Sequence, residues 1–282
     1  MSTKNVRSRT ASPSDEAELA TYRAVVEYDG TNFCGFQYQP ELRTIAGELE
    51  TALSRLFDRP VKVTAAGRTD AGVHAIGQVI SFTSHANFPV EKLAIALNSA
   101  LPEDLSARDA ALAERRFNAR LSALERRYTY LVLNRRAPSA AMRRWTHFEH
   151  RELDLDAMRA AAAQLVGTHD FVTFCGVLPD TGGTVRTLRA LEIERSGELV
   201  RLNFCANGFL HRMVRVICGT LLEVGTGRRG PDLAPMLAAR DRRVAGPTAP
   251  PAGLFLVDVR YEGFSSGPAG GLRIPLHAVA GA

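Results

Sequence analysis

Residues 185–206, VRTLRALEIERSGELVRLNFCA, alternate between apolar and polar side chains on both sides of a central serine and glycine. A repeat of two residues is typical of strands that bury one face and expose the other. The stretch therefore predicts two strands in close succession, over residues 185–195 and 198–206. The alternating residues are Leu191, Glu192, Ile193 and Glu194 in the first strand and Val200, Arg201, Leu202, Asn203 and Phe204 in the second.

These two strands belong to a pattern that occurs twice along the chain. In the first half we expect strands at 22–28, 61–65, 78–83 and 105–113 and helices at 44–57 and 90–100. In the second half we expect strands at 128–133, 185–195, 198–206 and 254–261 and helices at 154–166, 209–224 and 233–239. Each half thus has the order β-α-β-β-α-β of a ferredoxin-like unit, in which helices cover one face of an antiparallel sheet. The sequence predicts an α+β fold whose two ferredoxin-like sheets lie side by side and form a long cleft.

The two halves define two domains, residues 21–120 and 121–263, which meet near residues 115–127. In the first domain Thr44 is placed to cap the helix that follows it. The ends of the chain, residues 1–20 and 264–282, offer little apolar surface to pack and are expected to be disordered tails.

The balance of charge favours a polyanionic partner. The formal net charge is +5 and the isoelectric point is about 9.3. Only Lys4, Lys62 and Lys92 are lysines, so nearly all of the positive charge is arginine, whose guanidinium suits phosphate groups and stacks on bases. Codon usage in a GC-rich genome would produce the same bias. The cleft is therefore expected to be basic.

Cysteine usage and hydropathy indicate the compartment. The four cysteines are far apart and form no C-x-x-C pair, so we expect reduced thiols rather than disulfides or a metal site. The first residues lack the apolar segment of a signal peptide, and no stretch has the length of a membrane span. These features predict a cytoplasmic protein.

One acidic residue stands out, because it lies between two glycines and follows an arginine by two positions. It is Asp70, within residues 67–75, GRTDAGVHA. The glycines allow a tight turn and a close approach of a ligand to the main chain. In that setting Asp70 could act as a nucleophile or a base without a metal, or simply bond to its own turn. His74 is the one candidate metal ligand nearby and has no companions, so no metal site is expected.

Two further strings carry functional residue types. Residues 206–215, ANGFLHRMVR, open the predicted helix at 209–224, and an arginine near a partly buried carboxylate would oppose its protonation. Residues 126–130, RRYTY, place two tyrosines on one side of a strand. Aromatic residues in that position are either core or a stacking surface for a base.

Together these three strings resemble the motifs of the tRNA pseudouridine synthase A family, and they occur in the family's order. Two weaker strings also match: residues 27–37, EYDGTNFCGFQ, with Phe36 where tryptophan is more usual, and residues 184–188, TVRTL. The resemblance spans about residues 22–261.

The resemblance implies an isomerase that converts uridine to pseudouridine at positions 38, 39 and 40 of the tRNA anticodon stem-loop. It implies that Asp70 is catalytic and that Arg215 pairs with it. It further implies that Tyr128 stacks on the target uracil, that Arg68 helps to extrude the uridine, and that Arg186 contacts the RNA. The family needs no cofactor or metal, and it acts as a homodimer in a basic RNA-binding cleft.

Two other functions fit parts of the same pattern. A non-catalytic RNA-binding module would keep the basic cleft but would not need Asp70, Arg215 and Tyr128 together. A pseudouridine synthase that acts on another RNA would keep all three. Whether Asp70 attacks the sugar, attacks the ring or removes a sugar proton stays open at this point.

Overall fold

The computed structural model describes residues 19–86, 88–180 and 182–267. The predicted tails lie mostly outside these ranges. Residues 19 and 20, which the sequence assigned to the first tail, begin a strand, and residues 264–267 follow the last long strand.

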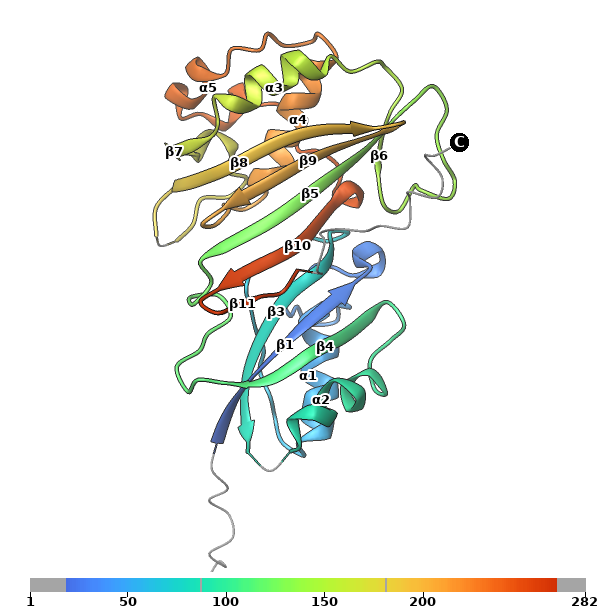
Figure 1. Ribbon diagram of the computed structural model, residues 1–282, viewed down its shortest axis with the longest axis vertical. Helices are drawn as coiled ribbons and strands as arrows, with labels where there is room; N and C mark the ends of the chain where they lie inside the picture. The colour runs from blue at the N-terminus through green and yellow to red at the C-terminus, as the bar shows by residue number, and fades with distance from the viewer. Residues whose placement is uncertain (1–18, 87, 181, 268–282) are drawn as a thin grey trace, which may run out of the picture.

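All strands of the described part of the chain belong to one sheet, in which the longer strands run in the order β4-β1-β3-β10-β5-β9-β8-β7 (Figure 1). The strands are β1 Leu19–Tyr28, β2 Thr64–Ala65, β3 His74–His85, β4 Leu105–Ala113, β5 Glu125–Asn134, β6 His147–Glu149, β7 Gly167–Asp170, β8 Val185–Ser196, β9 Leu199–Ala206, β10 Leu254–Tyr261 and β11 Phe264–Ser265. The short strands β2, β6 and β11 pair with β3, β5 and β10.

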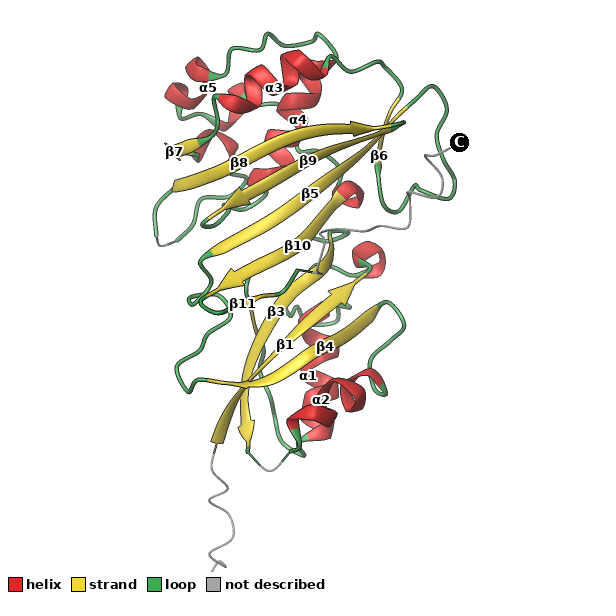
Figure 2. Ribbon diagram, viewed as in Figure 1, coloured by secondary structure: helices red, strands yellow, loops and turns green. Residues whose placement is uncertain are grey.

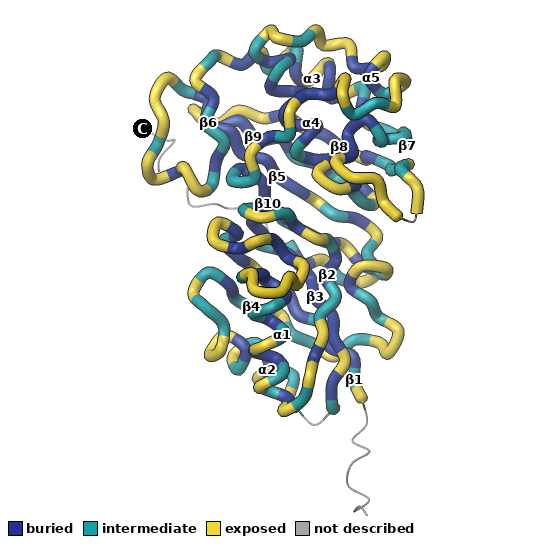
Figure 3. Tube along the Cα trace, turned by 180° about the vertical axis from the view of Figure 1, so that it is seen from behind, coloured by how far each residue is buried: buried dark blue, intermediate teal, exposed yellow. Residues whose placement is uncertain are grey.

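Helices cover one face of this sheet, which confirms the α+β class (Figure 2). They are α1 Ile45–Leu56, α2 Val90–Asn98, α3 Leu155–Ala163, α4 Met213–Gly225 and α5 Ala234–Ala239, with short 3-10 helices at Gly30–Asn32, Val172–Phe174, Arg242–Val244 and Pro251–Gly253. Seen from behind, α1 and α2 lie over the lower part of the sheet and α3, α4 and α5 over the upper part (Figure 3). As expected, Thr44 caps α1: its hydroxyl accepts a hydrogen bond of 3.2 Å from the Gly47 amide.

The two halves repeat one strand arrangement. In the first half the order is β4-β1-β3-β2, and in the second it is β10-β5-β9-β8. Numbered within each half, both orders read fourth, first, third and second strand. Each half therefore has the β-α-β-β-α-β order that the sequence predicts, with β6 and β7 as additions in the second half.

The two halves join edge to edge through β3 and β10. These strands run parallel and pair His74 with Phe255 and Ala75 with Leu256. The edge of β3 is free there because β2 is only two residues long and pairs farther along β3. No further residues of the two strands pair, although the backbones still approach closely at Gly77, where a side chain would lie 2.3 Å from the Val257 carbonyl oxygen. The two predicted sheets are thus one continuous sheet.

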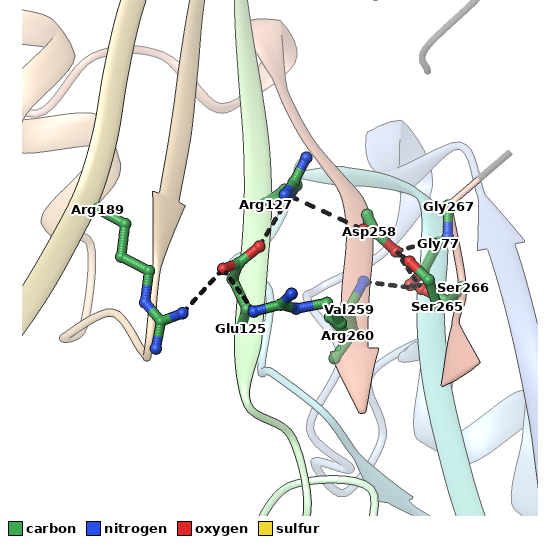
Figure 4. Close-up of polar contacts among 10 residues, drawn as sticks. All are labelled: Gly77, Glu125, Arg127, Arg189, Asp258, Val259, Arg260, Ser265, Ser266 and Gly267. Atoms are coloured by element: carbon green, nitrogen blue, oxygen red, sulfur yellow. Dashed lines mark hydrogen bonds and ion pairs between the residues drawn. The ribbon is translucent and has the colours of Figure 1, made fainter. Parts of the chain in front are cut away.

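A buried serine fills the gap where β3 and β10 separate. The Ser266 hydroxyl donates to the Gly77 carbonyl at 2.6 Å and accepts from the Val259 amide at 2.8 Å (Figure 4). Arg108 of β4 donates to the Ser266 carbonyl at 2.7 Å. The segment after β11 therefore connects the two halves of the sheet.

Several elements differ from their predicted bounds, and three of them are shorter than predicted by at least three residues. The strand expected at 61–65 is reduced to β2, and the helix expected at 154–166 ends at Ala163. The helix expected at 209–224 begins only at Met213, because Arg212 has a left-handed backbone with φ of 58°. Residues 209–212 form a turn instead of the first turn of the helix.

Candidate active site

The Asp70 loop, residues 66–73, connects β2 to β3 at the place where the two halves meet. Gly72 takes φ of 77°, and the Val73 amide donates to the Asp70 carbonyl at 3.2 Å, which closes a tight turn. The loop packs on the segment that precedes α1: the Phe36 amide donates to the Thr69 carbonyl at 3.0 Å. The main chain around Asp70 is therefore fixed.

The side chain of Asp70 forms an ion pair with Arg215 of α4. Arg215 Nη1 lies 2.6 Å from Asp70 Oδ2, and the two side chains are only 12% and 22% exposed. Arg215 Nε also donates to the Ala249 carbonyl at 2.8 Å. Such a charge-assisted hydrogen bond is stronger than one between neutral groups and fixes the orientation of the carboxylate. The structure thus brings together one predicted residue from each half.

A segment of chain that crosses α4 holds Arg215 in this position. We call residues 246–249 the crossing segment. The Gly246 amide donates to the Thr220 hydroxyl at 2.9 Å, and the Ala249 amide donates to the Arg215 carbonyl at 3.0 Å. Contact is so close at Gly219 that a side chain there would lie 1.8 Å from the Pro247 carbonyl oxygen.

Two more basic side chains lie near Asp70, and the sequence assigned neither of them a role. His211 Nε2 is 3.7 Å from Asp70 Oδ1, and Arg212 Nε is 4.0 Å from Asp70 Oδ2. The predicted helix placed both residues opposite its apolar stripe, on the same side as Arg215. They approach it because residues 209–212 form a turn, which the His211 carbonyl anchors by accepting from the Gly176 amide at 2.8 Å.

Tyr128 lies in the wall of the site and is 8% exposed. Its ring packs edge-on against Phe209, with the centroids 5.2 Å apart, and its hydroxyl is 3.2 Å from the position that a side chain on Gly67 would take. Burial raises the pKa of the Tyr128 hydroxyl, which is therefore protonated at neutral pH. Tyr130 is fully buried and donates to the Pro250 carbonyl at 3.0 Å, as expected for packing.

The two remaining predicted residues lie on either side of this centre. Arg68 follows Gly67 and is exposed, and it forms no hydrogen bond or ion pair with the residues that the structure describes. Arg186 opens β8 and donates to the Val185 carbonyl at 2.6 Å. Its guanidinium is 3.6 Å from the position that a side chain on Gly208 would take, next to the turn at 209–212.

Arg126 is a half-buried cross-link to which the sequence assigned no role. Its guanidinium donates to the carbonyls of Ala66 at 3.0 and 3.3 Å and of Asn207 at 2.8 Å. It also donates to the carbonyls of Arg120 at 2.5 Å and Ala123 at 3.0 Å. Burial lowers the pKa of Arg126. It therefore ties the start of the Asp70 loop to the chain that precedes the turn at 209–212.

The opposite face of β5 carries a separate cluster of charges (Figure 4). Glu125 is 4% exposed, and its carboxylate contacts Arg127 at 2.9 Å, Arg189 at 3.3 Å and Arg260 at 3.4 Å. Successive residues of a strand point to opposite faces, so Arg127 and Tyr128 lie on different sides of the sheet. This cluster is not part of the Asp70 site.

His74, the candidate metal ligand of the sequence, is a buried packing residue. It is 1% exposed, and its ring lies 4.7 Å from the ring of Phe255 and 5.0 Å from that of Trp145. Its Nδ1 accepts from the Gly30 amide at 3.1 Å, and burial lowers its pKa. Among the described residues, no group of three or more His, Cys, Asp or Glu side chains has the arrangement of a metal site. No helix within the described ranges has both the length and the apolarity to cross a membrane.

A family model and relatives found by sequence agree on one family. A family model described as tRNA pseudouridine synthase matches residues 24–120 and 161–262. The chain is 45% identical over 232 residues to tRNA pseudouridine synthase A of Halalkalibacterium halodurans, covering 82% of this chain and 88% of the relative. It is also 45% identical over 245 residues to tRNA pseudouridine synthase A of Caulobacter vibrioides, covering 86% and 99%. A solved structure, the archaeal box H/ACA sRNP Nop10-Cbf5 complex, matches 71% of this chain and 44% of that chain with a TM-score of 0.32 and 15% identity.

Proposed function

Because this chain belongs to the tRNA pseudouridine synthase family, we propose that it isomerises uridines 38, 39 and 40 of the tRNA anticodon stem-loop with Asp70 as the catalytic residue. The family membership confirms the resemblance seen in the sequence and makes the chain an isomerase that acts on tRNA. The target positions and the role of Asp70 are the parts that we propose.

The observation that supports the role of Asp70 most strongly is its contact with Arg215. The two residues are 145 positions apart and come from different halves, yet their side chains meet at 2.6 Å. A non-catalytic RNA-binding module has no need for an acidic group held among cations in an RNA cleft, where it would repel phosphates. A synthase has that need.

The isomerisation requires a carboxylate and an enclosed site. A glycosidic C–N bond is broken and a C–C bond is formed within one nucleotide, without net oxidation or a group donor. Each of the three possible routes begins with an ionised Asp70, and Arg215 supplies the opposing charge and fixes the orientation of the carboxylate. Keeping the detached uracil in place gives the advantage of proximity when the ring returns to the same sugar.

The other predicted residues have places in this scheme. Tyr128 would stack on the extruded uracil beside Phe209, whose ring now meets the Tyr128 ring at an interplanar angle of 85°. Arg68 is free to enter the space that the uridine leaves or to hold its phosphate. Arg186 is placed beside the turn at 209–212 to contact RNA.

The remaining features of the proposal rest on the family resemblance. We propose a cytoplasmic homodimer that needs no cofactor or metal, in which one subunit holds the body of the tRNA while the other carries out the reaction. Residues 21–120 and 121–263 are proposed as its two domains.

The test is an assay of tritium release from tRNA transcripts that contain uridine labelled at C5. We expect release from the wild-type transcript, and none from a transcript with cytidine at positions 38, 39 and 40. Equal release from both transcripts would contradict the proposed positions. No release from any tRNA would contradict the activity itself.

A further inference from the structure

The chain that leads to Asp70 stops pairing with β3 after Ala66. The Ala66 amide still donates to the Val79 carbonyl at 2.8 Å, so the next pair in this antiparallel register would be Gly67 and Gln78. The backbones do not pair there. In an antiparallel ladder this pair would make no backbone hydrogen bonds to each other. The side-chain amide of Gln78 instead bonds both backbone groups of Gly67: its Oε1 accepts from the Gly67 amide at 3.3 Å, and its Nε2 donates to the Gly67 carbonyl at 2.6 Å.

The same amide is linked to the residue before Asp70. Gln78 Nε2 donates to the Tyr28 hydroxyl at 3.3 Å, and that hydroxyl shares a hydrogen bond of 2.8 Å with Thr69 Oγ1. Gln78, Tyr28 and Thr69 are 0%, 5% and 7% exposed. Burial raises the pKa of Tyr28 to about 12, so its hydroxyl stays neutral at neutral pH. The whole network is thus uncharged and shielded from water.

The network holds alternate residues of the Asp70 loop from beneath. Gly67 and Thr69 are held by buried groups, while Arg68 is exposed and Asp70 reaches Arg215. Side chains alternate in extended chain, so a buried Thr69 turns its two neighbours outward. Gly67 also lies against the Tyr128 hydroxyl, so a shift of this residue would change two walls of the site.

We propose that Gln78 is the positioning residue of the Asp70 loop. By bonding both backbone groups of Gly67 and, through Tyr28, holding Thr69, its amide lets the chain leave β3 while these two residues stay in place, and it thereby sets where Asp70 stands against the uridine. This inference rests on the proposed function of Asp70. A displacement of about 1 Å at a reacting group can reduce a rate about 100-fold.

The first test replaces the amide by an apolar chain of similar volume, Gln78→Met. We expect kcat for tritium release to fall about 100-fold with KM for tRNA unchanged. Hydrogen exchange of the amides of residues 66–73 should become faster. The matched control is Gln164→Met, because the amide of Gln164 likewise accepts from the Leu233 amide at 2.9 Å and donates to the Pro231 carbonyl at 2.9 Å. The control should keep the wild-type kcat.

The second test, Gln78→Glu, gives a readout that loss of stability does not produce. A neutral carboxylic acid can accept from the Gly67 amide and donate to its carbonyl, as the amide does. The ionised form cannot donate and faces the carbonyl oxygen at short range. Burial raises the pKa of a carboxylic acid, and buried glutamates can titrate at about pH 8–9. The kcat of this variant should therefore be highest at low pH and fall as pH rises through that range, whereas Gln164→Glu should follow the wild type.

The outcomes separate this inference from the proposed function. Wild-type kcat in Gln78→Met, or a pH profile of Gln78→Glu that parallels the wild type, would overturn the positioning role while the wild-type enzyme still releases tritium. Absence of release by the wild type would instead overturn the function. If circular dichroism shows that Gln78→Met does not fold, the pH profile of Gln78→Glu decides the question alone.

Discussion

Replacing Arg215 tests whether the contact between the two halves serves the reaction. Two variants separate its charge from its geometry. Arg215→Met removes the charge and both hydrogen bonds and keeps much of the apolar chain. Arg215→Lys keeps the charge, but its one nitrogen cannot hold Asp70 and the Ala249 carbonyl in the same geometry.

The expected magnitudes follow from the contacts. Arg215 donates to the Asp70 carboxylate at 2.6 Å and to the Ala249 carbonyl at 2.8 Å. A hydrogen bond that involves a charged group contributes about 1.5–3 kcal/mol, the range we take for the Asp70 contact that Arg215→Met loses. For the altered geometry in Arg215→Lys, which keeps the charge, we take the smaller range of about 0.5–1.5 kcal/mol. With about 1.4 kcal/mol for each tenfold change in rate, Arg215→Met should lower kcat about 10- to 150-fold and Arg215→Lys about 2- to 10-fold.

The assay is tritium release at saturating tRNA. Arg229→Met is the matched control, because Arg229 also pairs with a carboxylate, Glu223, at 2.8 Å and donates to a carbonyl, that of Val244, at 3.0 Å, away from Asp70. The control should turn over at the wild-type rate. Wild-type kcat in Arg215→Met would show that the contact with Asp70 does not serve the reaction. A lysine variant as slow as the methionine variant would also contradict this role, since the charge would then play no part.

Three other outcomes can be measured. Tyr128→Leu should weaken the hold on the extruded base by about 1–3 kcal/mol, seen as a lower kcat/KM in the tritium assay; an unchanged kcat/KM would exclude stacking. Gly219→Ala should lower the free energy of unfolding by about 1–3 kcal/mol, because its methyl group would meet the backbone of the crossing segment at 1.8 Å, whereas Gly230→Ala, with open space around it, should not; urea unfolding distinguishes them. Although burial alone would raise it, the pKa of Glu149 is lowered from 4.5 to about 2 by Arg151, so the stability that Glu149 adds is complete above about pH 4.5 and is lost as pH falls towards 2. The difference in unfolding free energy between wild type and Glu149→Gln should shrink over that range, and a difference independent of pH would contradict the assignment.

Local patterns were sufficient to predict most of the fold. The alternation in residues 185–206 became β8 and β9, and the two β-α-β-β-α-β halves are present. The sequence could not reveal how the halves join. His74 can pair with Phe255 because β2 leaves this part of the β3 edge free. The two strands are distant in the sequence, and no pattern near either residue indicates the pairing.

The sequence predicted the site residues that lie in motifs. It missed residues whose contacts in the site are with backbone groups. The strings around Asp70 and Arg215 pointed to a pair that the structure places at 2.6 Å. His211 was given no role, although the predicted helix put it on the same side as Arg215, because its distance from Asp70 depends on the turn that precedes α4. Arg126 and Gln78 were missed because their partners are backbone groups of the Asp70 loop, and a sequence shows which side chains are present but not which backbone groups they meet.

The most direct test of the catalytic role of Asp70 is Asp70→Asn, which keeps the shape of the side chain and removes its charge. We expect Asp70→Asn to give no tritium release above the level without enzyme. The variant should still bind tRNA, less tightly as salt rises, because phosphate contacts release counterions. Appreciable release by Asp70→Asn would contradict the claim that this carboxylate carries out the reaction.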